Sequence, residues 1–380
     1  MKLFPLFASS LIIGLVVPGA YAQEKMLPTS KDAPTLENTW DIHYRDLEPV
    51  LEQKLKEAPD SLDTLDELAR VYLGLGKFSE AGELYHHALE LREAASGRES
   101  MDVVRTLENL ARVDQVLHKM DEAETLLARA VAIRETNQGA THPEVAAEYN
   151  TLARLFVMEK KLPDSEPLFS RAIAILETNY GPADLRLCST LDSLAAVYRD
   201  ETKLSEAEPL LRRALIIRDI AAGPVHAEIA NSLDSLAGLY YAEKRFSDAQ
   251  PLYERSLGIW MTLLGPDHPL VATSLDNLAV VYAMLERYQE AAQLYKRALE
   301  IRDAQDAASL HNLALVEVGL KNDREAAGYY KRMAALNPPN PAPALHEYAE
   351  VLRRLHHPAE AAAMERKSKA EAAKKALENK

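Results

Sequence analysis

The sequence is poor in cysteine, glycine, phenylalanine and basic charge, and each shortage excludes a class of protein. Cys188 is the only cysteine in 380 residues, so no disulfide can form within the chain. With 14 glycines and 6 phenylalanines, a β-rich fold is disfavoured. The 44 Lys and Arg against 58 Asp and Glu give a net charge of −14, which disfavours a nucleic-acid surface, since binding phosphates needs a basic face. Helix packing must therefore stabilise the fold, and we predict that Cys188 is a small buried hydrophobe at the start of a helix.

Long hydrophobic runs are also absent after the first residues of the chain. The N-terminus combines Lys2, an apolar run Leu3–Val17 and small residues at Ala20 and Ala22, which is typical of a secretory signal. We therefore predict a signal peptide at 1–22, cleaved after Ala22, and an exported protein that is periplasmic or secreted. A retained membrane anchor is the alternative, although the run is shorter than the 18 or more residues that a membrane span needs. No later segment is apolar enough to cross a membrane.

A Leu-Ala pair recurs at fixed intervals and sets the organisation of the chain. Its alanine repeats at steps of 42 residues and then of 35, at Ala69, Ala111, Ala153, Ala195, Ala237, Ala279, Ala314 and Ala349. Such self-similarity indicates a stacked array of helical units. In each unit, two apolar patterns of helical period flank a polar turn, and each presents an apolar stripe that only stacking can cover. We expect a flexible lead-in and a degenerate capping helix near Leu47–Leu55 at 23–60, seven units at 61–338, and a degenerate unit with a solvating helix at 339–380.

The ends of these helices carry their own sequence signals. Ser205 with Glu208, and Asp121 with Glu124, are spaced as capping boxes at the start of a second helix. Glycines that suit a left-handed helix C-cap follow each second helix at Gly97, Gly139, Gly181, Gly223 and Gly265. Three histidines recur in the loops that follow, His142, His226 and His268. One repeat separates neighbouring histidines by roughly 10 Å, too far for one metal ion, so we expect loop or cap residues.

The segments GPDHPLVATSLDNLAVVY at 265–282 and RYQEAAQLYKRALEIR at 287–302 resemble tetratricopeptide repeats of the kinesin-light-chain-like branch. The resemblance implies an all-α fold, a right-handed superhelix (α-solenoid) of about seven hairpins, whose first helices line a concave groove that holds peptide segments. Asp114 and Glu317 depart from the pattern by replacing a first-helix aromatic residue. Pro163 with Ser165 is expected to distort the third unit.

The resemblance also implies a row of polar groove residues on the first helices, where an asparagine amide can pair with the backbone of an extended peptide. The row consists of Glu67, Asn109, Thr151, Ser193, Ser235, Asn277 and Asn312. The alternative is that these residues are merely solvated.

Acidic residues precede that row by one position, and arginines follow some of them four residues later. Asp66 and Glu108 therefore form expected i,i+4 pairs with Arg70 and Arg112. Asp192, Asp234 and Asp276 lack such an arginine. We therefore expect a groove that is charge-balanced near the N-terminus and becomes acidic and apolar toward the C-terminus, where it would bind a basic and apolar segment. A solvated charged face is the alternative. The candidate partner-binding residues are Asn109, Asn277, Asn312, Asp192, Asp234, Asp276, Arg112 and Arg154.

Motifs for catalysis are missing from the sequence: it has no nucleophile elbow, phosphate-binding glycine loop, zinc-protease helix or paired cysteine motif. We expect no enzyme activity, cofactor, metal or small-molecule substrate. The prediction is an exported scaffold that binds a peptide segment or a partner protein in its groove. The alternative is a self-assembling structural protein or a membrane-anchored assembly factor that uses its end units, and a homo-oligomer is possible in either case.

Overall fold

The computed structural model describes residues 36–303 and 305–378, and all regular structure in these ranges is helical. The expected signal peptide and most of the expected lead-in lie outside the described residues. Helix α2 (Leu36–Glu57) comes first and begins inside the segment expected to be flexible. It packs against α3, and its Leu51 is 2% exposed. The expected capping helix is therefore present and is longer than the Leu47–Leu55 pattern indicates.

In the part of the chain that the structure describes, eight helical hairpins follow α2. Their first helices are α3 (Leu62–Gly74), α5 (Val104–Val116), α7 (Pro143–Met158), α9 (Cys188–Asp200), α11 (Ala227–Ala242), α13 (Pro269–Met284), α15 (Ala307–Gly319) and α17 (Ala342–Arg354). Their second helices are α4 (Phe78–Ser96), α6 (Met120–Gln138), α8 (Leu162–Tyr180), α10 (Leu204–Ala222), α12 (Phe246–Leu264), α14 (Tyr288–Ile301), α16 (Asp323–Ala335) and α18 (Pro358–Glu378). Short 3-10 turns precede α5 and α9, at η1 (Met101–Val103) and η2 (Leu185–Leu187). The expected all-α repeat fold is confirmed.

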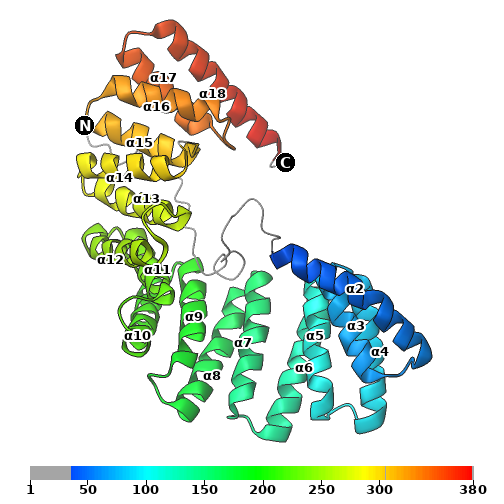
Figure 1. The fold of residues 1–380 in the computed structure, drawn as a ribbon. Coiled ribbons are helices and arrows are strands. Elements are labelled where there is room, and N and C mark those ends of the chain that lie inside the picture. Colours follow the sequence, from blue (N-terminus) through cyan, green and yellow to red (C-terminus); the bar gives the residue numbers. More distant parts are fainter. Residues whose placement is uncertain (1–35, 304, 379–380) are drawn as a thin grey trace. The chain divides into compact units, whose positions relative to one another are not determined.

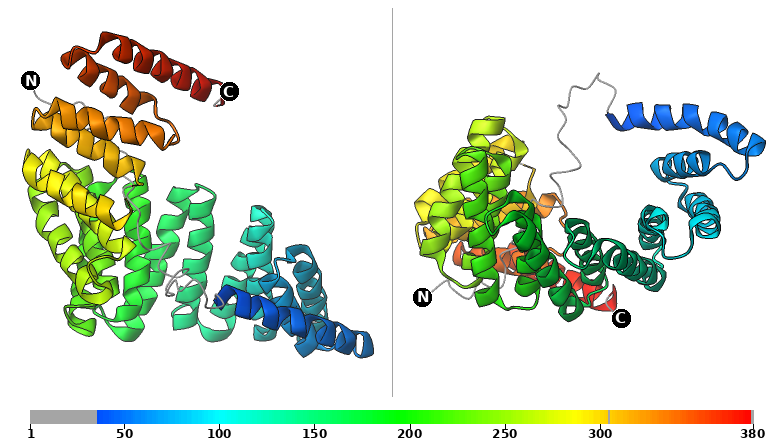
Figure 2. Two further views of the ribbon diagram at one scale, coloured as in Figure 1. Left: turned by 45° about the horizontal axis from the view of Figure 1, so that its top comes forward. Right: turned by 90° about the horizontal axis from the view of Figure 1, so that it is seen from below.

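The chain forms two compact units, and we describe each by itself. The N-terminal unit comprises the described residues up to Ile217, and the C-terminal unit comprises those from Arg218 onward. Within each unit, successive hairpins lie side by side (Figures 1 and 2), so that each second helix also packs against the first helix of the next hairpin.

Small residues at repeated positions form the core of both units. The alanines of the Leu-Ala pair, from Ala69 to Ala349, are all at most 1% exposed. A bulky residue of the second helix fills the space beside them, as Tyr85, Phe169 and Tyr330 do. Because each alanine lies where two helices approach closely, a larger side chain at that position would clash.

Ser165 occupies the position of a core alanine in the third hairpin without distorting it. The side chain is fully buried, and its hydroxyl donates to the carbonyl of Leu162 at 2.7 Å. Helix α8 is continuous from Leu162 to Tyr180, with Pro163 in its first turn, where proline is tolerated. The expected distortion at this site is therefore wrong.

The turn inside each hairpin is built on one residue with positive φ, two positions before the second helix begins. In the first hairpin this residue is Gly76; in the others it is His118, Lys160, Thr202, Lys244, Glu286, Lys321 and His356, all with φ near 60°. Helix α6 then starts at Met120 with Lys119 as its N-cap, and no side chain caps it. The capping box expected at Asp121 and Glu124 is therefore wrong, because the tight turn starts the helix before Asp121. In the other expected box, the Ser205 hydroxyl donates to Glu206 instead.

The loops after the second helices have the expected positive φ at their glycines, but the expected left-handed C-cap is wrong, because ψ is 146–165° at Gly97, Gly139, Gly181 and Gly265. The recurring glycines have φ between 75° and 92°, a region that L side chains rarely adopt. His142, His226 and His268 are helix N-caps whose Nδ1 accepts a backbone N–H two residues later, at 3.2–3.3 Å. These histidines therefore have a capping role, as expected.

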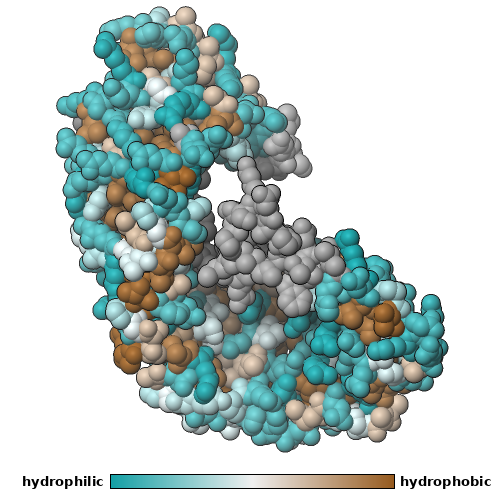
Figure 3. All heavy atoms as spheres, in the orientation of Figure 1, coloured by the Kyte–Doolittle hydropathy of each residue, from teal (hydrophilic) through white to brown (hydrophobic). Residues whose placement is uncertain are grey.

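The visible surface in Figure 3 is mostly hydrophilic with separate apolar patches, which agrees with apolar stripes that are covered by stacking. Among the described residues, no helix is both long and apolar enough to span a membrane.

Candidate functional site

The acidic residues of the first helices contact arginines from the last turn of the second helices, 26 residues later. Arg92 donates to both carboxylate oxygens of Asp66, at 2.6 and 3.1 Å, and to the hydroxyl of Thr106 on the next first helix at 2.6 Å. Three consecutive helices therefore meet at one guanidinium. We call this arrangement of acid, arginine and hydroxyl the polar junction.

The same junction recurs in the C-terminal unit. Arg302 contacts Asp276 of α13 and donates to the hydroxyl of Ser309 on α15 at 3.1 Å. The Ser309 hydroxyl donates in turn to Asp276 at 3.0 Å. Burial raises the pKa of Asp276 to about 6, and Arg302 opposes that rise. Asp276 therefore has a partner inside the protein, and it does not make the groove acidic as expected.

Two of the first six hairpins lack the arginine, with different results. In the third, Leu176 stands at the arginine position and Asn150 at the acid position, and the Asn150 amide donates to Thr190 at 2.8 Å. In the fifth, Trp260 replaces the arginine but Asp234 keeps its carboxyl group. Asp234 is 6% exposed, its Oδ1 has no hydrogen-bond partner, and Oδ2 accepts from the Trp260 indole at 3.4 Å. Burial raises its pKa to about 6, so Asp234 is a core residue and not an exposed ligand contact.

Arg70 and Arg112 are left without partners because Asp66 and Glu108 pair with second-helix arginines, and Arg154 is left without one because Asn150 stands in place of the acid. Arg70, Arg112 and Arg154 occupy equivalent positions on α3, α5 and α7, and all three are exposed. None has an ion pair or a side-chain hydrogen bond with another residue in the part of the chain that the structure describes. The i,i+4 pairs expected for Arg70 and Arg112 are wrong, because Arg92 and Arg134 bind those acids. We call these three residues the arginine row.

The expected asparagine row divides between the two units. Asn109 lies on α5, three residues before Arg112, and is half-buried. In the C-terminal unit, Asn277 is half-buried, whereas Asn312 is 6% exposed with a buried Oδ1 that lacks a partner. Asn312 therefore does not present its amide as an exposed groove residue would. Asp192, on α9 of the N-terminal unit, is half-buried.

A pocket of about 270 Å³ opens between α5 and α7, with Arg134 of α6 among its lining residues. Arg134 donates to Glu108 at 3.0 Å, to Glu148 at 2.6 Å, and to Glu144, so one guanidinium binds three carboxylates. Glu148 is only 4% exposed. Burial and the neighbouring Glu108 raise its pKa to about 8, against the opposing effect of Arg134. Arg112 also lines this pocket.

Glu148 is unusual among the first seven hairpins, because the equivalent residue in each of the other six carries a hydroxyl group. These residues are Thr64, Thr106, Thr190, Ser232, Ser274 and Ser309. Aligning the repeats by their period reveals this exception in the sequence. The same alignment places Arg92, Arg134, Arg218 and Arg302 at one repeat position. The sequence analysis missed the exception at Glu148 and the row of second-helix arginines because it compared residues within one helix. The contacts join different helices: each arginine lies 26 residues after its acid and 14 residues before the hydroxyl position.

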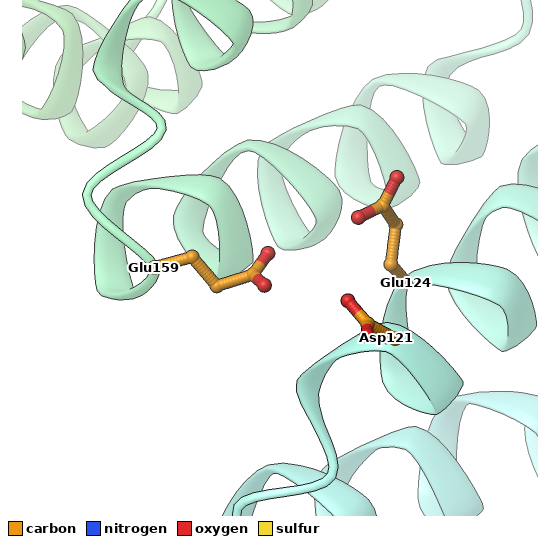
Figure 4. A group of neighbouring side chains, drawn as sticks. All are labelled: Asp121, Glu124 and Glu159. Atoms are coloured by element: carbon orange, nitrogen blue, oxygen red, sulfur yellow. The ribbon is translucent and has the colours of Figure 1, made fainter.

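Three carboxylates from α6 and the end of α7, Asp121, Glu124 and Glu159, bring oxygen atoms within 4.8 Å of one another (Figure 4). Lys161 already supplies a cation there, at 2.9 Å from Glu124 and 3.3 Å from Glu159. Lys203 repeats this contact 42 residues later, at 3.0 Å from Glu201. The group is therefore part of a recurring turn, and the lysine balances its charge.

The last repeats contain a separate buried polar cluster. His311 stands at the acid position of α15, and its Nε2 lies 2.6 Å from Glu347 of α17. The Tyr330 hydroxyl donates to the same carboxylate at 3.1 Å. All three side chains are buried, so this cluster joins α15, α16 and α17 and is not a groove contact.

Comparison with known proteins agrees with this repeat organisation. A family model described as "Tetratricopeptide repeat" matches residues 60–135, 102–178, 185–260 and 228–304, which together cover more than half of the chain. No curated protein matches the chain.

Solved structures offer similar repeats. One is the putative kinesin light chain of Podosopora anserina with nearly identical TPR-like repeats, at 25% identity and a TM-score of 0.49. That match covers 55% of this chain and 99% of the other. A second is BtubC (BKLC) from P. vanneervenii, at 23% identity and a TM-score of 0.49, which covers 64% of this chain and 92% of the other.

Proposed function

Because the chain belongs to the tetratricopeptide repeat family, we propose that it is a protein-interaction scaffold, and that its N-terminal unit binds an extended acidic segment of a partner protein. The arginine row of α3, α5 and α7 is the observation that carries this proposal. Three unpaired guanidinium groups on one repeated position favour a ligand that brings carboxylates at a matching spacing.

The geometry of the array sets that spacing. Neighbouring hairpins stack roughly 10 Å apart, and a chain in the extended polyproline II conformation advances about 3.1 Å per residue and presents every third side chain on the same face. An acidic side chain at every third residue would therefore meet Arg70, Arg112 and Arg154 in turn. Asn109 lies beside Arg112, where its amide can donate to and accept from the backbone of such a segment.

This proposal reverses the charge that the sequence suggested for the ligand. The expected basic segment relied on unpaired acids toward the C-terminus, but Asp276 contacts Arg302 and Asp234 is buried beside Trp260. The exposed arginine row is instead positive, and it lies in the N-terminal unit.

We also propose that the protein works outside the cytoplasm, in the periplasm or after secretion. This part rests on the signal-like sequence of residues 1–22 alone. Sequencing the N-terminus of the mature protein tests it: a start at Gln23 is the expected result, and a start at Met1 would support a retained anchor.

The binding proposal is tested with a labelled peptide, acetyl-EAAEAAE-amide, and fluorescence anisotropy. The variant Arg70→Gln/Arg112→Gln/Arg154→Gln is expected to bind the peptide at least tenfold more weakly than the wild type, since each exposed pair contributes up to about 1 kcal/mol. The control Arg98→Gln/Arg186→Gln/Arg212→Gln removes the same charge from three exposed arginines of the N-terminal unit outside the first helices. Equal weakening in both variants would contradict a specific arginine row.

A further inference from the structure

The pocket between α5 and α7 lies within the surface that carries the arginine row. It is lined by Glu108 and Arg112 from α5, Arg134 from α6, and Glu144 and Glu148 from α7. We propose that this pocket receives a lysine side chain of the bound segment, so that the partner motif is a lysine flanked by acidic residues. The inference rests on the proposed function and adds the identity of the central residue.

The balance of donors and acceptors in the pocket favours a second cation. Arg134 donates to one oxygen of each carboxylate: Glu108 Oε1, Glu144 Oε2 and Glu148 Oε1. Gln138 donates to the same oxygen of Glu144, and Glu148 and Glu108 also share a hydrogen bond, but Arg134 is the one cation paired with these three carboxyl groups among the described residues. A lysine ammonium offers three donors on a compact charge, and its flexible stem can reach into a narrow pocket.

The composition of the pocket distinguishes it from the other polar junctions. Arg92 faces one acid and the Thr106 hydroxyl, whereas Arg134 faces three glutamates because Glu148 replaces the hydroxyl. The extra carboxyl group is buried in the protein beside Glu108, although a threonine would satisfy the same arginine donor without a charge. A ligand cation would compensate for this burial when the segment is bound.

The position of the pocket sets the register of the motif. The pocket lies between α5, which carries Arg112, and α7, which carries Arg154. Two acidic residues three positions apart would reach these arginines, and a residue between them would lie over the pocket. The motif is therefore an acid, a lysine within the next two positions, and a second acid.

Binding of a lysine in this pocket should release a proton from Glu148. The charged groups that face Glu148 are Glu108 and Arg112 of α5, Arg134 of α6, and Glu144 of its own helix. Burial raises the pKa of Glu148, so much of its population carries a proton at neutral pH. An ammonium in the pocket favours the carboxylate, and binding should release that proton. Affinity for a lysine-containing segment should therefore rise with pH until Glu148 is ionised without the ligand.

The test compares two peptides, acetyl-EAKEAKE-amide and acetyl-EAQEAQE-amide, by isothermal titration against the full chain. A lysine between each pair of acids places one over the pocket in either direction of the bound segment. The wild type is expected to bind the lysine peptide at least tenfold more tightly, with a proton release that appears as a difference between buffers of unequal ionisation enthalpy. Glu148→Thr installs the residue of the neighbouring hairpins, so it should remain folded, as circular dichroism can check. In that variant both the lysine preference and the proton release should vanish, while both peptides still bind.

A second variant, Glu108→Gln, should reduce the lysine preference without restoring a hydroxyl. If the wild type binds both peptides equally and releases no proton, the lysine inference is overturned and the arginine row stands. If a lysine preference persists in Glu148→Thr, the lysine binds elsewhere and the inference also fails. If neither peptide binds, the proposed function fails, and the inference fails with it.

Discussion

The two units use the same hairpin but differ in the charge that their first helices expose. The N-terminal unit exposes the arginine row of α3, α5 and α7. At the four positions of the C-terminal unit that match this row, the side chains are Gly238, Val280, Leu315 and Glu350, and Asp234 has a buried carboxyl oxygen without a partner. One repeated scaffold can therefore present a charge to a partner or hold it inside the core, depending on a few substitutions.

The largest expected effect comes from breaking a polar junction. Arg302→Leu removes the cation that faces Asp276 and Asp306, and both acids then lose a partner in a partly buried site. The free energy of unfolding should fall by about 2–4 kcal/mol. Urea denaturation followed by circular dichroism measures it, with Arg297→Leu on the same helix as the control.

The Arg297 side chain is half-exposed and contacts exposed acids. Arg297→Leu should therefore lower the free energy of unfolding by less than about 1 kcal/mol. Equal losses in the two variants would show that the junction contributes no more than a surface ion pair.

A smaller effect, of opposite sign, is expected from removing the unbalanced acid of the C-terminal unit. Burial raises the pKa of Asp234 to about 6 in the folded state, above its unfolded value, so the wild type should lose stability as pH rises from about 4 to 6. Asp234→Asn should remove this loss and be more stable at pH 7 by about 1–3 kcal/mol, with little gain at pH 4. Thermal unfolding at both pH values checks it.

The exposed Asp63 of α3 serves as the control, because Asp63→Asn should leave the pH profile unchanged. An Asp234→Asn variant that is destabilised at pH 7 would show that the carboxylate has a partner the structure does not show.

The smallest expected effect tests whether the turns of the two units have the same backbone conformation. Thr202 of the N-terminal unit and Lys244 of the C-terminal unit both have φ of 61° at the same turn position. Replacing either with glycine relieves that strain, and each should stabilise the chain by about 0.5–1 kcal/mol. Calorimetry that finds opposite signs would mean that the units differ in backbone as well as in charge.

The fold and the core could be predicted from the sequence, because the spacing of the Leu-Ala pairs gives the repeat length. The repeat length in turn identifies the positions that pack between neighbouring helices. Ala69 and its equivalents are buried as that argument requires. The charge of the first-helix surface did not follow, since Asp66 lies four residues from Arg70 in sequence yet contacts Arg92 on another helix. Helical spacing identifies which side chains are near enough to pair, and only the packing decides which of two arginines an acid contacts. The turn geometry could not be predicted from the sequence either, because residues other than glycine, such as Lys160, adopt a positive φ there.

Hydrogen–deuterium exchange of the full chain, with and without acetyl-EAAEAAE-amide, tests the central claim most directly. The account predicts slower exchange in α3, α5 and α7 on peptide binding and no change in α11, α13 and α15. Protection confined to α11, α13 and α15 would contradict it and return the binding surface to the C-terminal unit, where Asp276 and Asn277 lie on α13.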